Sequence, residues 1–414
     1  MTDFTVKPGT TVRLGKVDGE LRVGRNARIE AESGRKVVVS GGAHFEGPVT
    51  IDCDFECASM RVEGRGFGPG GDVLVKGSLQ VRGDLEIDAA TEVQGDISAG
   101  RVDIGGHLKS GSISSKGVRV GGHMEVMGEL RADDVDVGGH LTVEKHVEID
   151  NLRVGGHAEV GGGTIKGEIR VRGHFKTAGK LNYGTIQVFG QLRLPSGCRG
   201  ERLVALGKVE CDGDTYARTF EVNGAASVRG NCSAETLKSN GKLDVVGSLK
   251  VSERLEVLGS VEAGKEVECG QLVSAGRLKA DRVLVKGNAE VAGQASTASG
   301  MKAREVSVGT GSRVNGPMVA EKVDVGKGID TGGFWGQASG WRSIGGMTRV
   351  DDVYGNEIII ERYSQAKRVY GVNVRMQPGS MADEVGYTSE ADISDGVHLG
   401  MPLRKLDRLP GSPL

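Results

Sequence analysis

Aromatic rings, clustered cysteines, long apolar runs and an excess of one charge are scarce or absent in this 414-residue chain. Aromatic residues make up 4% of it, which excludes a core built on large rings and leaves little material for the aromatic platforms on which sugars stack. No apolar run approaches the roughly 18 residues of a membrane-spanning helix. The net charge of −2 gives no indication of nucleic acid or an anionic membrane as partner.

The cysteines and the first residues bear on the cellular compartment. The six cysteines are scattered, at Cys53, Cys57, Cys198, Cys211, Cys232 and Cys269. This spacing predicts no disulfide framework and favours a reducing compartment. Cys53 and Cys57 are four residues apart but no second pair follows, so we expect no zinc site. Segment 1–10 is polar and does not resemble a signal peptide, so we expect a cytoplasmic protein.

Glycine is in excess, with 69 residues, and much of it recurs at a fixed spacing. Gly-Gly-His occurs at 105–107, 121–123, 138–140 and 155–157, and Arg-Gly-His at 172–174, so the histidines are 16, 17, 17 and 17 residues apart. Other residues continue the register after glycine, at Gln191, Lys208, Ala225, Lys242, Ser260, Gln271 and Asn288. A repeat of this kind predicts a solenoid of stacked units.

The pattern inside each unit predicts the shape of the coil. Apolar residues alternate with polar ones, as at Leu141 and Val143, which is typical of a strand with one buried face. The step from Ser260 to Gln271 is 11 residues, shorter than 17 by six, which is one short strand and its corner. We therefore predict an all-β fold, a triangular parallel β-helix with about 17 residues per coil, in which the glycine motif sometimes moves to a neighbouring edge.

Glycine at a corner would supply a backbone conformation that a residue with a Cβ resists. Roughly 19 coils would fit between Val12 and Ile329 at one coil per repeat. Three segments are expected: an N-terminal segment or incomplete first coil over 1–22, the β-helix over 23–329, and a C-terminal extension over 330–414. The glycine period is lost in this extension, which holds both tryptophans. We expect the extension to cap the coil in part and to end in a disordered tail.

Several motifs have a functional interpretation and a structural one. The histidines His107, His123, His140, His157 and His174 would form a line along one edge, about 4.8 Å apart. That line would suit a metal ladder or a pH-sensitive edge, but no carboxylate or cysteine recurs beside it, so we interpret it as an exposed corner position. Residues 259–266 resemble a nucleotide P-loop but end in Glu266 and lie inside the repeat, so we expect no nucleotide and no other cofactor. The repeat also shows no recurring acidic cluster of the kind found in polysaccharide-cleaving β-helices, so we expect no enzymatic activity.

The pattern Val-x-Val-Gly-Gly-x-Leu-x-Val, as in residues 135–143, resembles that of the bactofilins, the polymer-forming cytoskeletal proteins. The resemblance covers roughly residues 12–329. It implies a right-handed coil that assembles end to end into non-polar filaments without nucleotide, often at the membrane or cell wall. It therefore implies that the protein's main partner is itself, with membrane or cell-envelope proteins as further partners at the cell periphery. The long coil and the C-terminal extension depart from the usual bactofilin pattern.

The two ends of a β-helix expose strand edges and an open core, so they are the places where copies would meet. The interface residues predicted from the apolar pattern at both ends are Phe4, Val6, Val12, Leu14, Val323, Val325 and Ile329. A structural polymer is the first hypothesis. The alternative is a scaffold or dimer that the C-terminal extension caps, and a carbohydrate-active enzyme is a third.

Overall fold

The computed structural model describes residues 3–63, 73–328 and 346–412. These residues contain strands and no helix, and the strands pair in parallel to form a β-solenoid of about 22 turns, with roughly 17 residues per turn. The all-β solenoid predicted from the repeat is therefore confirmed. The chain divides into two compact units, one of residues 1–201 and 206–208 and one of residues 202–205 and 209–414, which are described separately.

The strands of the first unit are short until β12. They are β1 (Phe4–Val6), β2 (Thr11–Leu14), β3 (Lys16–Val17), β4 (Leu21–Val23), β5 (Ala27–Ala31), β6 (Lys36–Val39), β7 (Gly42–Phe45), β8 (Val49–Ile51), β9 (Asp54–Cys57), β10 (Ser59–Val62), β11 (Val73–Val75), β12 (Leu79–Ile87), β13 (Thr91–Val93), β14 (Ile97–Ile104), β15 (Leu108–Ser110), β16 (Ile113–Val120), β17 (Met124–Val126), β18 (Leu130–Val137), β19 (Leu141–Val143), β20 (Val147–Val154), β21 (Ala158–Val160), β22 (Gly163–Val171), β23 (His174–Thr177), β24 (Leu181–Val188) and β25 (Gln191–Leu194). Two further strands contain residues of both units, β26 (Cys198–Ala205) and β27 (Lys208–Cys211).

The strands of the second unit are β28 (Thr215–Val222), β29 (Ala225–Val228), β30 (Cys232–Ser239), β31 (Lys242–Val245), β32 (Leu249–Val257), β33 (Ser260–Ala263), β34 (Glu266–Ser274), β35 (Arg277–Val285), β36 (Asn288–Val291), β37 (Gln294–Lys302), β38 (Glu305–Gly309), β39 (Arg313–Asn315), β40 (Met318–Lys327), β41 (Thr348–Ile360), β42 (Ser364–Met376), β43 (Met381–Ile393), β44 (His398–Leu399) and β45 (Arg404–Lys405). The longest strands of the second unit are β41, β42 and β43, with 13 residues each.

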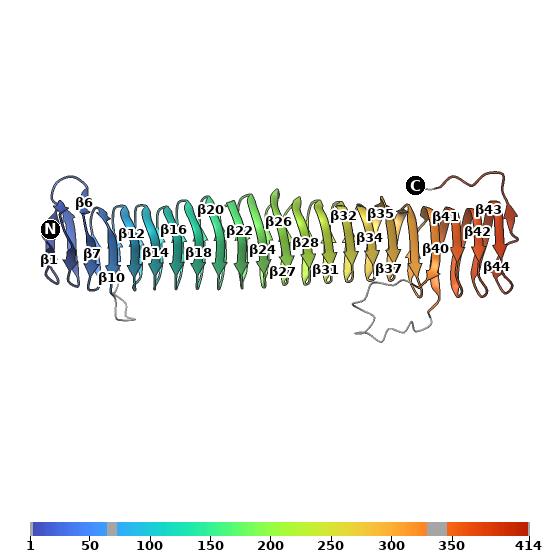
Figure 1. Cartoon of the computed structure of the whole chain (residues 1–414), viewed down its shortest axis with the longest axis horizontal. Coiled ribbons are helices and arrows are strands. Elements are labelled where there is room, and N and C mark those ends of the chain that lie inside the picture. Colours follow the sequence, from blue (N-terminus) through green and yellow to red (C-terminus); the bar gives the residue numbers. More distant parts are fainter. Residues whose placement is uncertain (1–2, 64–72, 329–345, 413–414) are drawn as a thin grey trace. The chain divides into compact units, whose positions relative to one another are not determined.

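Three columns of paired strands form the first unit, one per face of the coil. One column is β1–β4–β7–β10, the second is β2–β5–β8–β11–β13, and the third is β3–β6–β9. From β12 onward a single bent strand crosses two faces, since its first half pairs with β9 and its second half with β10. Strands of consecutive turns lie side by side in this unit (Figure 1). The predicted coil of three faces is therefore present.

The alternation of apolar and polar residues decides which side chains fill the interior. Leu141 pairs with Met124 in the preceding turn and with Ala158 in the following turn, and all three side chains are buried. Thr142, between two inward residues, is exposed. Each turn thus adds a few aliphatic side chains to a narrow column, which no single turn could bury alone.

The corner glycines are required for a different reason from the one the sequence predicts. Gly138 and Gly155 do not have the positive φ that would exclude other residues. A Cβ on Gly155 would instead lie 2.3 Å from the carbonyl oxygen of Gly138 in the turn before, and a Cβ on Gly138 would lie 2.4 Å from that of Gly121. Glycine recurs here because the corners of successive turns stack too closely for a side chain.

The irregular step at Gln271 has the predicted cause. Ser260 pairs with Lys242 and with Arg277, which are 18 residues before it and 17 after it. Gln271 pairs with Arg254 in a different column. The 11-residue step therefore marks a glycine motif on a neighbouring face, and the turn itself keeps its length.

The predicted boundary at residue 329 is wrong for the part of the extension that the structure describes. Strands β41, β42 and β43 have 13 residues each and continue the solenoid directly on β40, with Val353, Val369 and Val385 stacked in one column. These turns account for the difference between the roughly 19 coils expected and the 22 found. Within the described part of the extension, the short strands β44 and β45 are the strands that cover an end, since both pair with β43. Trp335 and Trp341 lie outside the described residues.

Candidate assembly interface

The first turn of the solenoid has one unoccupied edge. β1, β2 and β3 form a complete turn, so segment 1–22 is not an incomplete coil. They pair with β4, β5 and β6, and no strand within residues 3–63, 73–328 and 346–412 pairs with their other edges. We call the outer surface of these three strands the N-terminal edge. An uncovered strand edge of this kind is a template for pairing with another chain.

All four predicted N-terminal interface residues line the open end of the core. Phe4 stacks on Leu21, Val6 on Val23, and Val12 on Ile29. Val6 and Leu14 are buried, Val12 is half-buried, and Phe4 is 40% exposed, since no strand of the described residues pairs with the outer edge of β1. Val17 in β3 also faces inward and was missed, since its two-residue strand is too short to show an alternation.

Alternate backbone N–H and C=O groups of the N-terminal edge point away from the solenoid. The N–H of Phe4 donates to the carbonyl oxygen of Glu20 at 2.9 Å, and the carbonyl oxygen of Val6 accepts from Gly24 at 2.9 Å. In a parallel ladder alternate residues bond to opposite neighbours, so the N–H and C=O of Thr5 point away from β4. The same reasoning applies to Thr11 and Arg13 in β2, since Thr10 and Leu14 accept from β5 and from the residue after it. In this turn, the backbone groups of inward-facing residues bond to the next turn. The backbone groups of outward-facing residues point to the side where a preceding turn would lie.

The predicted second interface near Val323 and Val325 is wrong. Val323 pairs with Val306 and Ile358, Val325 pairs with Val308 and Ile360, and both side chains are fully buried. They therefore belong to an interior turn. The sequence misplaced the end because the last turns carry no glycine motif. Ile329 lies outside the described residues.

The histidine column forms a stacked ladder in the first unit. The rings of His123, His140, His157 and His174 are parallel to within 5°, with centroids 4.5 to 4.8 Å apart. His107 is tilted by 35° from His123, and their Nδ1 atoms are 3.0 Å apart. The predicted alignment is therefore confirmed. No group of three or more His, Cys, Asp or Glu side chains that could hold a metal ion occurs among the described residues.

The neighbouring rings affect the protonation of His123. Partial burial, and then the charges that His140 and His107 would carry, lower the pKa of His123 below its usual value. A lowered folded-state pKa means that the unfolded chain takes up more protons as the pH falls below about 6.5, so stability declines there.

We predict that the melting temperature of the protein falls between pH 7.5 and 5.5 by about 1 °C more than that of a His123→Gln variant. Glutamine is the matched replacement because Gln191 occupies the same column. Differential scanning calorimetry at the two pH values measures the difference. Equal declines in the two proteins would show that His123 does not contribute.

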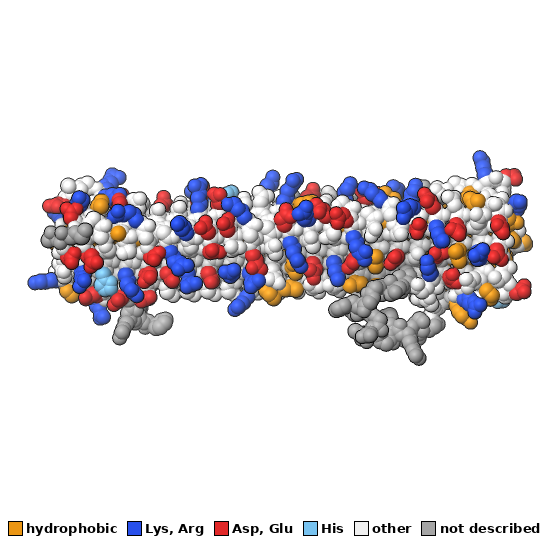
Figure 2. All heavy atoms as spheres, in the orientation of Figure 1, with side chains coloured by type: hydrophobic (Ala, Val, Ile, Leu, Met, Phe, Trp, Pro, Cys, Tyr) orange, Lys and Arg blue, Asp and Glu red, His pale blue; other side chains and the backbone are white. Residues whose placement is uncertain are grey.

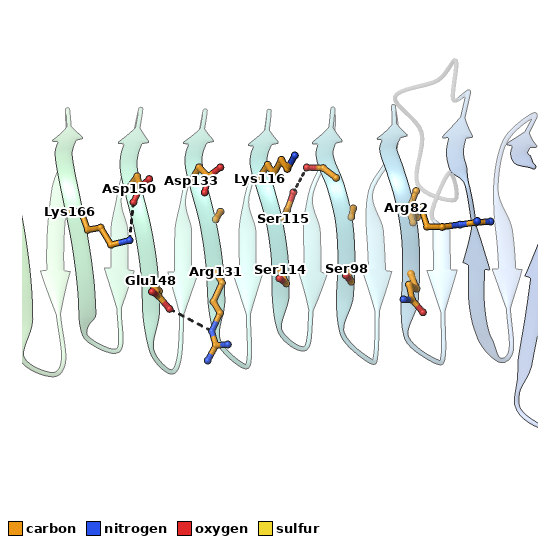
Figure 3. A pocket seen from close by; sticks show the side chains of 15 residues that line it. Arg82, Ser98, Ser114, Ser115, Lys116, Arg131, Asp133, Glu148, Asp150 and Lys166 are labelled. Carbon is orange, nitrogen blue, oxygen red and sulfur yellow. Dashed lines mark hydrogen bonds and ion pairs between the residues drawn. The ribbon is translucent and has the colours of Figure 1, made fainter.

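A groove of about 560 Å³ crosses several turns of the first unit. Small inward residues, Ala99, Ser115 and Ala132, form its floor. Charged residues at its rim pair along the stack: Lys166 with Asp150 at 3.4 Å and Arg131 with Glu148 at 3.9 Å (Figure 3). No aromatic residue lines it. The charged residues of the groove therefore pair with residues of neighbouring turns, and their arrangement does not by itself indicate a catalytic site.

The cysteines are part of the core. All six are buried free thiols. Burial raises the pKa of Cys53 to about 11 and that of Cys57 and Cys269 to about 12. Thiols in this state are protonated at neutral pH, so they pack as small apolar side chains.

The outer surface is charged, with both signs interspersed. On the face seen in Figure 2, Lys and Arg side chains alternate with Asp and Glu, and hydrophobic side chains form small separate groups. No helix of the described residues is long and apolar enough to cross a membrane. No family model, curated protein or solved structure matches this chain.

Proposed function

We propose that this protein is a structural element that self-associates end to end through its N-terminal edge, without nucleotide or catalysis. The observation that carries the proposal is the uncovered first turn, where apolar side chains and unpaired backbone groups occur together. Phe4 is 40% exposed although its column partner Leu21 is fully buried. A second chain stacked on this edge would bury the side chain and pair the backbone.

The resemblance of the glycine repeat to that of the bactofilins supports the same proposal from the sequence. It extends the proposal to a cytoskeletal role, with the protein itself as main partner and envelope components as further ones. The regular charge pairing between turns supports a stiff scaffold, since many ion pairs link consecutive turns, such as Lys176 with Glu159 and Lys279 with Glu262.

Negative-stain electron microscopy of the purified protein, in buffer free of nucleotide, tests the proposal. We expect elongated assemblies longer than one molecule, and analytical ultracentrifugation should show a mass that rises with concentration. Discrete monomers at every concentration up to about 100 µM would refute self-association, since the dissociation constant of a specific contact is expected to be lower than this concentration.

A dimer is the second candidate, and one observation favours it. β44 and β45 cover part of the last full strand, β43, so the C-terminal end is less open than the N-terminal end. If this cover blocked the end, assembly would stop when two N-terminal edges met. The particle lengths in the same micrographs distinguish the two cases: a dimer has the length of two molecules at most, whereas a filament has no fixed length.

A further inference from the structure

The C-terminal end of the second unit has a vacant position. β44 pairs with Met381 and Ala382 at the start of β43, and β45 pairs with Gly386 and Tyr387 in its middle. Within the described part of the chain, no strand pairs with the outer edge of residues 388–393, the last segment of β43. We call this segment the C-terminal edge. The final turn is therefore filled on two of its three faces.

We infer that β1 of a second copy occupies this vacant position, so that copies join head to tail. The resulting assembly would be polar, unlike the non-polar filaments that the bactofilin resemblance implies. This inference rests on the proposed self-association and names its second surface. The chain winds through three faces in a fixed order, and β44 and β45 already occupy the first two. The next strand in that order would be the first strand of the incoming copy, with its β2 and β3 stacking over β44 and β45.

Backbone hydrogen bonding fits this arrangement. The N–H of Ser394 donates to the carbonyl oxygen of Met376 at 3.0 Å, so Asp392 bonds toward β42, and the backbone groups of Ala391 and Ile393 point outward. Thr5 of the incoming copy presents its N–H and C=O in the opposite direction. The Thr5 N–H can donate to Ala391, and the Thr5 carbonyl can accept from Ile393. The joint would repeat the ladder found between interior turns.

The side chains match in the same register. Ala391 and Ile393 stack on the buried Val374 and Met376, so they face the core, yet both are only half-buried, since no strand of the described residues pairs with this edge. Phe4 would lie over Ala391, and Val6 over Ile393. The large exposed ring thus meets a small side chain, which leaves room for it.

The charges of the two ends do not distinguish one joint from another. Residues 379–395 contain five carboxylates, Asp383, Glu384, Glu390, Asp392 and Asp395, and no Lys or Arg. Residues 3–18 contain three bases, Lys7, Arg13 and Lys16, against two acids, Asp3 and Asp18. Neighbouring turns at this end already pair opposite charges, as Arg375 does with Asp392 at 3.1 Å. A head-to-tail joint would place Asp3 beside Glu390 and would stack β3, which contains Lys16, over Arg404 and Lys405 of β45. The strand order, the backbone register and the apolar column therefore carry the inference, and charge does not select the joint.

Two variants, each with one blocked edge, test the inference. Phe4→Asp places a charge on the N-terminal edge, and Ala391→Glu places one on the C-terminal edge. We expect each variant alone to remain monomeric. An equimolar mixture should form a one-to-one complex, because each variant keeps the edge that the other lacks. Sedimentation velocity with one variant fluorescently labelled detects this complex, with an affinity at least about tenfold higher than the self-association of either variant.

The outcomes separate this inference from the proposed function. If Ala391→Glu alone forms dimers, the N-terminal edges meet each other, and the head-to-tail joint is wrong although self-association stands. If the unmodified protein is monomeric, the proposed function fails first. Asn182→Glu is the matched control, because Asn182 is exposed on β24, a strand paired on both sides, and the variant should assemble normally. Ile393→Asp provides a second block if Ala391→Glu fails to fold.

Discussion

Phe4→Asp is expected to leave the protein folded and to abolish assembly. The side chain is 40% exposed at the open end of the core, so a carboxylate there can keep its water in the monomer. In an end-to-end contact the same carboxylate would be buried without a partner, which costs several kcal/mol. We expect a loss of at least ~2 kcal/mol of association free energy, or about 30-fold in affinity.

Phe189→Asp is the matched control for Phe4→Asp. Phe189 is 50% exposed and lies at a corner between turns, remote from either edge strand. It should assemble as the unmodified protein does, with the same melting temperature within about 2 °C. Equal loss of assembly in both variants would show that general surface hydrophobicity drives association, and the N-terminal edge would lose its assigned role.

Val325→Asp is expected to act in the opposite way, by unfolding the last turns. Val325 is fully buried between Val308 and Ile360, so the new carboxylate would lie inside the core with no base to pair with it. We expect a loss of stability on the order of 3–5 kcal/mol in the second unit. Urea unfolding followed by circular dichroism, together with limited proteolysis, measures it.

The neighbouring substitution Val319→Asp controls for the added charge. Val319 lies on the same strand, β40, and is half-exposed, so this variant should lose less than about 1 kcal/mol. If Val325→Asp stayed as stable as the unmodified protein and only lost assembly, Val325 would lie at an end, as the apolar pattern alone predicts.

Local periodicity was sufficient to predict the coil. Each inward residue of a β-solenoid contacts the equivalent residue one turn away, so the spacing that buries Leu141 between Met124 and Ala158 appears directly in the sequence. The short step at Gln271 even indicated the number of faces, and the alignment of the histidines followed from the same register. In this fold, contacts between turns repeat at nearly constant separation, so a one-dimensional pattern contains most of the fold.

The ends were harder to predict, because an end is defined by the contacts that it lacks. Phe4 and Val12 were identified since they begin the alternation, but the same reasoning placed the other end at Val323 and Val325. The signal that it missed is a second period of 16 residues, visible as Val-Tyr-Gly at 353–355 and again at 369–371. Without the glycine motif, only the pairing of β41 to β40 shows that the stack continues.

The sequence by itself determined the strands, the three faces and the inward residues of this protein, because these depend on neighbours at a regular spacing. Only the tertiary structure showed why the corners need glycine: a carbonyl oxygen of the preceding turn occupies the space that a Cβ would take. It also decided which edges remain open, since the cover that β44 and β45 provide over β43 depends on a tail that returns without any periodic signal. Whether a strand edge is unpaired depends on all the turns of the stack, so a single repeat cannot show it.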